Sequence, residues 1–159
     1  MQRVRLAVVP LRVLLALLFA MLVLFQTLSL PGQFAHMAEE SPDMAHLRWP
    51  LTAFAVLELL FVQIVIVCTW KLLTMVTTDR IFSDRSFAWV DTIVGAIAAA
   101  WILLVGGLLY VGFTADDPGL PLLLTLMVLF GAVLGLVMLV MRALLRLATT
   151  LQTDMAAVI

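Results

Sequence analysis

Charged residues are spaced along this chain so that the stretches between them have the length of a bilayer crossing. A helix rises about 1.5 Å per residue, so a hydrocarbon core of about 30 Å needs about 20 residues. Four such stretches occur, and Glu58 is the one charged residue inside them. They are residues 13–38, 49–70, 92–115 and 118–141. The sequence therefore predicts an all-α integral membrane protein, a bundle of four transmembrane helices.

The composition supports the same fold class. Hydrophobic residues make up 65% of the chain and charged residues 12%, against roughly 45–50% and about 25% in soluble domains. We expect a single four-helix domain over residues 1–159, in which the lipid bilayer is the first partner. Its predicted spans are residues 10–30, 50–70, 90–113 and 120–142, and the Pro31-Gly32 pair should stop the first helix.

Lys and Arg residues predict the orientation, because they are retained in cytoplasmic loops. All nine except Arg48 lie in the N-terminal residues 3–12, between residues 71 and 85, or in the tail that begins at Arg142. Both termini are therefore expected in the cytoplasm. The outer side would carry an acidic loop at residues 31–48 and a short turn at residues 114–119.

Several function classes are excluded or left without support. The net charge is −1 and the basic residues form no cluster, which excludes direct nucleic-acid binding through a basic surface. The lone Cys68 excludes an internal disulfide. We find no catalytic motif and no cofactor signature, so no enzyme and no cofactor are predicted. His36 and His46 are interpreted as solvated loop side chains, with weak metal binding beside the acids of residues 39–43 as the alternative.

Glu58 is the polar residue that most needs an explanation, because a carboxylate at bilayer depth costs about 2.5–3.5 kcal/mol. Gln26 lies at a similar depth on the first span and is its candidate partner. Gln63 follows Glu58 on the same helix but is turned about 140° away from it. Two interpretations remain open: an interhelical hydrogen bond that fixes helix register, or a proton or cation site in a small oligomeric transporter.

Small residues predict where the helices pack, because membrane helices associate through close backbone contact. Gly95, Ala99 and Gly106 form one stripe of the third span, and Gly131 and Gly135 form a GxxxG in the fourth. The turn that joins these spans is short, so we expect an antiparallel hairpin. The alternative is that these glycines form a homodimer face.

The cytoplasmic loop between the second and third spans is amphipathic. Asp84 should begin the third helix, with the preceding serine as its N-cap. Aromatic and basic side chains can then reach the interface and its anionic headgroups. The loop could be an ordinary connector, a docking surface for a cytoplasmic protein, or a site that recognises lipid headgroups. The candidate residues are Arg80, Phe82, Ser83, Arg85 and Phe87.

Three short segments here carry a resemblance to a known family. They are Leu72-Leu73-Thr74-Met75-Val76, the turn Ile81-Phe82-Ser83, and Phe87. The sequence resembles the YoaS-like bacterial family of four-helix membrane proteins of unknown function. That family often has a glycine just before the Phe-Ser turn, where this sequence has Asp79-Arg80. The resemblance implies a multi-pass protein of the bacterial cytoplasmic membrane and, as a partner, a small helix-turn-helix transcription factor.

The predicted function is therefore a non-enzymatic membrane protein that acts through protein interaction, with a helix-turn-helix regulator or a second copy of itself as partner. The tail after Met141 is expected to continue the fourth helix past the interface and to offer a second docking surface. The alternative is a small oligomeric transporter or proton-coupled carrier that uses Glu58.

Overall fold

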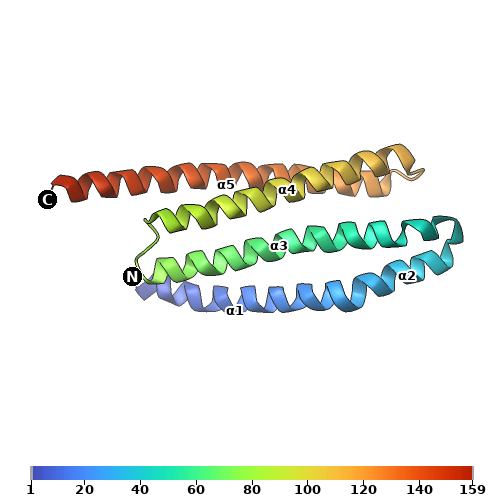
Figure 1. Cartoon of the computed structure of the whole chain (residues 1–159), viewed down its shortest axis with the longest axis horizontal. Helices are drawn as coiled ribbons and strands as arrows, with labels where there is room; N and C mark the ends of the chain where they lie inside the picture. The colour runs from blue at the N-terminus through green and yellow to red at the C-terminus, as the bar shows by residue number, and fades with distance from the viewer. Residues whose placement is uncertain (1, 159) are drawn as a thin grey trace. The chain divides into compact units, whose positions relative to one another are not determined.

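The computed structural model describes residues 2–158, without the side chain of Met44, and within them all regular structure is helical (Figure 1). The prediction of an all-α fold is confirmed. The helices are α1 (Gln2–Leu24), the π-helical η1 (Phe25–Ser29), α2 (Leu30–Glu40), the 3-10 helix η2 (Pro42–Leu47), α3 (Arg48–Thr77), α4 (Asp84–Thr114) and α5 (Gly119–Val158).

Within the described residues, four helical stretches are long and apolar enough to cross a membrane, which is what the charge spacing predicts. Each runs past its predicted span, because backbone hydrogen bonds continue a helix beyond the hydrocarbon boundary that the charges mark. The four stretches are Gln2–Glu40, Ala45–Thr77, Asp84–Thr114 and Gly119–Val158.

The predicted helix stop at Pro31-Gly32 is wrong, because the helix continues to Glu40. A proline inside a helix lacks a donor, and its ring collides with the carbonyl four residues earlier. Here a π-helical turn comes directly before the proline, and the Leu30 N–H donates to the Phe25 carbonyl, five residues back. The wider turn accommodates Pro31 in the first turn of α2. Most of the predicted outer loop is consequently helical.

The chain divides into two compact units, the first ending at Ile66 and the second beginning at Val67. In the first unit, the continuous helix α1-η1-α2 runs beside the N-terminal part of α3 (Figure 1). Two hydrogen bonds of the Gln26 side chain, one donated to α3 and one accepted from it, connect η1 to α3.

In the second unit, α4 and α5 form the antiparallel hairpin that the short turn predicts. The indole N–H of Trp101 on α4 donates to the Val128 carbonyl of α5 over 2.9 Å. Closer to the C-terminal end of α5, the Arg142 guanidinium forms a hydrogen-bonded ion pair with Asp91. The hairpin is therefore joined by polar contacts at two levels along its length.

Candidate functional site

A polar contact inside the apolar helices joins Gln26 of η1 to Gln63 of α3. The Gln63 amide N–H donates to the Gln26 side-chain oxygen over 2.7 Å. The Gln26 amide N–H then donates to the main-chain carbonyl of Val56 over 3.1 Å. Gln63 is only 7% exposed. The Gln26 amide thus has a partner on both its oxygen and its nitrogen, as buried polar groups require.

The candidate pairing of Gln26 with Glu58 is therefore wrong, and helix geometry explains why. Val56 and Gln63 are seven residues apart, so they lie on nearly the same face of α3. Glu58 is turned about 140° from Gln63 on that helix. Gln26 and Glu58 lie at a similar depth along their helices, but depth alone does not determine which face of α3 meets η1. The signal in the sequence was the chemistry of two amides, since each can donate to and accept from the other.

Glu58 itself is half-buried, and its Oε1 is a buried atom that has no hydrogen-bond partner among residues 2–158. An unsatisfied buried polar atom costs free energy that folding must offset. The carboxyl group therefore remains able to hold a proton or to bind a donor from outside the described chain. Glu58 is one of the two candidate functional features in the first unit, together with the glutamine pair.

The histidines and acids before α3 make no metal site. The Nε2 atom of His36 lies 3.2 Å from the Oε1 atom of Glu40, four residues later on the exposed surface of α2. Throughout the part of the chain that the structure describes, no three His, Cys, Asp or Glu residues are grouped so that they could hold a metal ion.

The small residues of the hairpin do not all lie in its interface. A Cβ added at Gly131 would lie 3.1 Å from the Cδ1 atom of Trp101, and one at Gly135 would lie 3.5 Å from Ile97. Gly131 thus allows a close approach of α5 to α4, whereas a Cβ at Gly135 would make an ordinary van der Waals contact. By contrast, a Cβ at Gly95 or Gly106 would meet nothing within 4 Å, and Ala99 is half-buried.

The loop after α3 begins with a helix-terminating motif that needs a left-handed residue. Asp79 has φ 55°. The Asp79 N–H donates to the Val76 carbonyl over 3.4 Å, and the Arg80 N–H to the Met75 carbonyl over 2.9 Å. This is the Schellman arrangement, in which glycine usually takes the left-handed position. Here an aspartate takes it, which is one of the few other residues that tolerate this conformation.

The turn into α4 is held by serine hydroxyl groups. The Ser83 hydroxyl donates to the Arg80 carbonyl over 2.7 Å, and Ser83 makes no side-chain cap to the helix. The Ser86 hydroxyl donates to the Ser83 carbonyl over 2.7 Å. Ser86 is completely buried. The helix starts at Asp84, as predicted, but Ser86 was missed because a serine three residues further along resembles an ordinary polar helix residue.

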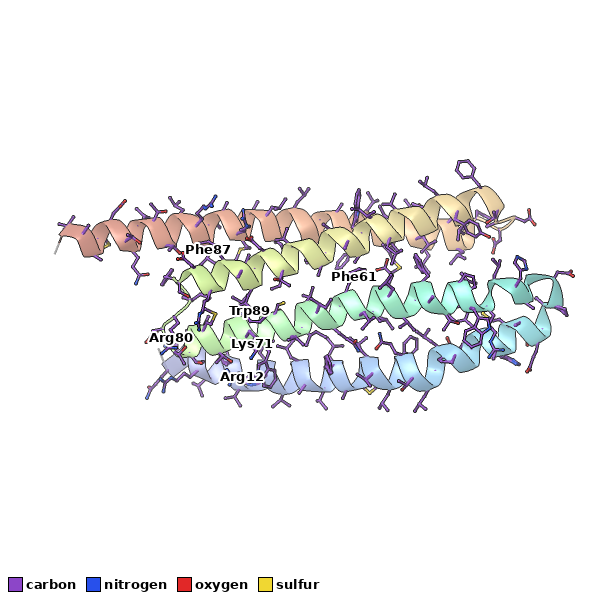
Figure 2. The ribbon with its side chains drawn as sticks, in the orientation of Figure 1. Arg12, Phe61, Lys71, Arg80, Phe87 and Trp89 are labelled. Carbon is purple, nitrogen blue, oxygen red and sulfur yellow. The ribbon has the colours of Figure 1, made fainter. Side chains whose placement is uncertain are left out.

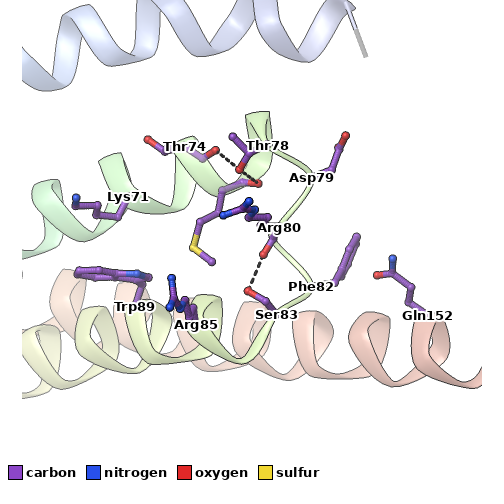
Figure 3. A pocket seen from close by; sticks show the side chains of 11 residues that line it. Lys71, Thr74, Thr78, Asp79, Arg80, Phe82, Ser83, Arg85, Trp89 and Gln152 are labelled. Carbon is purple, nitrogen blue, oxygen red and sulfur yellow. Dashed lines mark hydrogen bonds between the residues drawn. The ribbon is translucent and has the colours of Figure 1, made fainter. Parts of the chain in front are cut away.

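A pocket of about 820 Å³ opens between the end of α3, the loop, the start of α4 and the C-terminal part of α5 (Figure 3). All of its lining belongs to the second unit. Four of the five candidate loop residues line it, whereas Phe87 does not. Lys71, Trp89 and Gln152 also line the pocket but were not among the candidate residues predicted from the sequence. Lys71 shares one face of α3 with Thr74 and Thr78 at helical spacing, which was the available signal. The lining residues are Lys71, Thr74, Met75, Thr78, Asp79, Arg80, Phe82, Ser83, Arg85, Trp89 and Gln152.

Basic side chains enter this pocket from three elements. Lys71 comes from α3, Arg80 from the loop and Arg85 from α4. Figure 2 shows Lys71, Arg80 and Trp89 at the same end of the second unit, where α3 ends and α4 begins. Asp79 is the one acidic residue of the lining. The pocket is therefore positively charged.

The C-terminal part of α5 is a helical extension that reaches well beyond Arg142. Leu145 and Ala148 are half-buried. Other apolar side chains of the extension form an exposed stripe at spacings of three and four residues, which places them on one face. They are Leu144, Leu147, Leu151 and Met155, which are 54–69% exposed.

One protein family matches most of the chain. The family described as "Protein of unknown function (DUF2975)" matches residues 32–159, which contain α3, α4, α5, the pocket and the exposed stripe. Comparison with curated proteins and with solved structures gave no match.

Proposed function

The chain belongs to the DUF2975 family of proteins of unknown function, and from this premise we propose that it is a non-enzymatic integral membrane protein that binds a cytoplasmic protein. The binding surface in this proposal is the exposed stripe of the α5 extension, Leu144, Leu147, Leu151 and Met155. A helix of the partner, packed along this stripe, would cover it.

The length of α5 is the observation that carries the proposal. Its 40 residues correspond to about 60 Å, against about 40–45 Å for a bilayer including its headgroups. The N-terminal end begins directly after the short turn that contains Asp117. The excess length is consequently at the C-terminal end, where an exposed apolar stripe is free to meet a soluble partner.

The orientation belongs to the same proposal. With four crossings, both termini would lie on the same side of the membrane. The Lys and Arg distribution favours the cytoplasmic side, and the resemblance to YoaS-like bacterial proteins favours the bacterial cytoplasmic membrane. That resemblance also suggests a small helix-turn-helix transcription factor as the partner, which the membrane protein would hold or release.

Affinity purification of the full-length protein in mild detergent, followed by mass spectrometry, tests this proposal. The Leu147→Glu, Leu151→Glu double variant should lose the partner, because charges on the stripe cannot be buried against an apolar helix. The matched control is Thr153→Glu, Ala156→Glu, which adds the same charge to exposed positions of α5 outside the stripe. Equal recovery of every cytoplasmic protein by the two variants would refute the proposal.

Glu58 supports a second candidate function, a small oligomeric proton-coupled carrier. The observation in its favour is the buried Oε1 atom that has no hydrogen-bond partner in the described chain. An intramembrane carboxyl group with an unpartnered buried oxygen is a natural proton site. In proteoliposomes, Glu58→Gln should abolish proton flux if this function holds. If Glu58→Gln and wild type gave the same proton flux while Glu58→Leu lowered the stability of the protein, Glu58 would be a structural residue only.

A further inference from the structure

We propose that the pocket between α3, the loop and α4 binds the phosphate group of an anionic phospholipid. This inference goes beyond the proposed protein interaction and does not depend on it. It rests on the charge of the pocket, on the fixed backbone of its central arginine, and on its position along the helices.

Three cationic side chains line the pocket without an anionic partner of their own. None of Lys71, Arg80 and Arg85 forms an ion pair with a carboxylate within residues 2–158, although all three line the same volume. Like charges gathered in one pocket repel each other unless an anion lies among them. Asp79 offsets only one of the three charges.

The backbone around Arg80 is held at both of its polar groups. Its N–H donates to the Met75 carbonyl over 2.9 Å, and its carbonyl accepts from the Ser83 hydroxyl over 2.7 Å. Figure 3 shows the Arg80 side chain directed into the space between α3 and α4, with Lys71 extending from α3 and Arg85 from α4. A guanidinium in a fixed position is suited to bidentate contact with phosphate oxygens.

The position of the pocket favours a lipid over a soluble phosphate. Lys71 directly follows the apolar stretch of α3, and Asp91 directly precedes that of α4, so the pocket lies at headgroup level in the predicted spans. Trp89 and Phe82 also line it, and such aromatic rings prefer the membrane interface. The volume of about 820 Å³ is within the range of about 300–1,000 Å³ typical of small-molecule sites. Basic pockets between membrane helices are suited to anionic headgroups.

Native mass spectrometry of the full-length protein in detergent tests the proposal, with phosphatidylglycerol and phosphatidylcholine of identical acyl chains as probes. Wild type should retain phosphatidylglycerol in preference to phosphatidylcholine. The triple variant Lys71→Gln, Arg80→Gln, Arg85→Gln should bind phosphatidylglycerol on the order of a hundredfold more weakly, since each basic residue near a lipid surface contributes about fivefold.

The matched control removes three exposed basic residues that do not line the pocket, through Arg3→Gln, Arg5→Gln and Arg146→Gln. It should bind phosphatidylglycerol as wild type does. Equal losses in the two triple variants would mean that only the overall charge attracts the lipid and would overturn the proposal.

A variant that strengthens binding excludes misfolding as the explanation. Asp79→Asn removes the one acid of the lining, and asparagine also tolerates the left-handed conformation. This variant should bind phosphatidylglycerol about fivefold more tightly. Unchanged or weaker binding would contradict the assignment.

A competition arm distinguishes the two sources of phosphate. Glycerol phosphate at millimolar concentration should leave the bound phosphatidylglycerol in place, because it lacks the acyl chains that hold a lipid beside the apolar helices. Displacement of the lipid, together with glycerol phosphate binding that the pocket triple variant abolishes, would show a site for soluble phosphates and would overturn the lipid assignment.

Discussion

The Gln63 side-chain amide donates a hydrogen bond to the side-chain oxygen of Gln26 over 2.7 Å, which joins α3 to the π-helical turn of the first membrane helix. The Gln26 amide N–H in turn donates a hydrogen bond to the main-chain carbonyl of Val56. Because hydrocarbon offers no competing water, this pair specifies which faces of the two helices meet.

A double-mutant cycle on the glutamine pair should show coupling. Gln26→Leu leaves the buried Gln63 amide unsatisfied, so it should destabilise the protein by about 1–2 kcal/mol. Adding Gln63→Leu should recover part of that loss, which gives a coupling energy of about 0.6–1.7 kcal/mol. The measurement is unfolding in detergent titrated with a denaturing surfactant. Strict additivity of the two single variants would show that the bond contributes nothing.

Gly131 of α5 should tolerate substitution less well than Gly95 of α4. Gly131→Leu must displace Trp101, whose Cδ1 would lie 3.1 Å from the new Cβ, and it should cost about 1–3 kcal/mol by overpacking. Gly95→Leu is the matched control, because a Cβ there meets nothing within 4 Å. Its stability should change by no more than about 0.5 kcal/mol. Equal effects would contradict the packing of α4 on α5.

Asp79 should be replaceable by glycine with a gain in stability. Its φ of 55° is unstrained for glycine, so Asp79→Gly should stabilise the protein by up to about 1 kcal/mol. Asp79→Val should destabilise it, because a β-branched residue is a strong outlier in this region. Thermal unfolding in detergent measures both variants, and the opposite order would argue against a left-handed residue at this position.

The hairpin of the third and fourth spans could be predicted from the sequence because short turns and apolar length are local properties. The continuation of the helix past Pro31 could not be predicted. It depends on a π-helical turn in which the Leu30 N–H donates to the Phe25 carbonyl, and no residue type in that turn is specific for this geometry. The pocket was predictable only in part. Arg80 and Arg85 are adjacent to a recognisable turn, whereas Gln152 lines the pocket from α5, which is far from that turn in the sequence.

The predicted orientation can be measured by cysteine labelling. In a Cys68→Ala background, Asp43→Cys and Asp117→Cys should react with an impermeant maleimide in intact bacterial cells. Asp79→Cys and Met155→Cys should react only after the membrane is opened, since their segments are predicted to face the cytoplasm. Labelling of Met155→Cys in intact cells would show that the orientation is opposite to the predicted one.

Photo-crosslinking in living cells shows whether the α5 extension binds a cytoplasmic protein. A photoreactive amino acid replaces Leu151 on the exposed stripe, and Thr153 outside the stripe serves as the control position. We expect one discrete adduct with a small cytoplasmic protein from position 151 and none from position 153. Adducts only between two copies of this chain, or identical adducts from both positions, would contradict it.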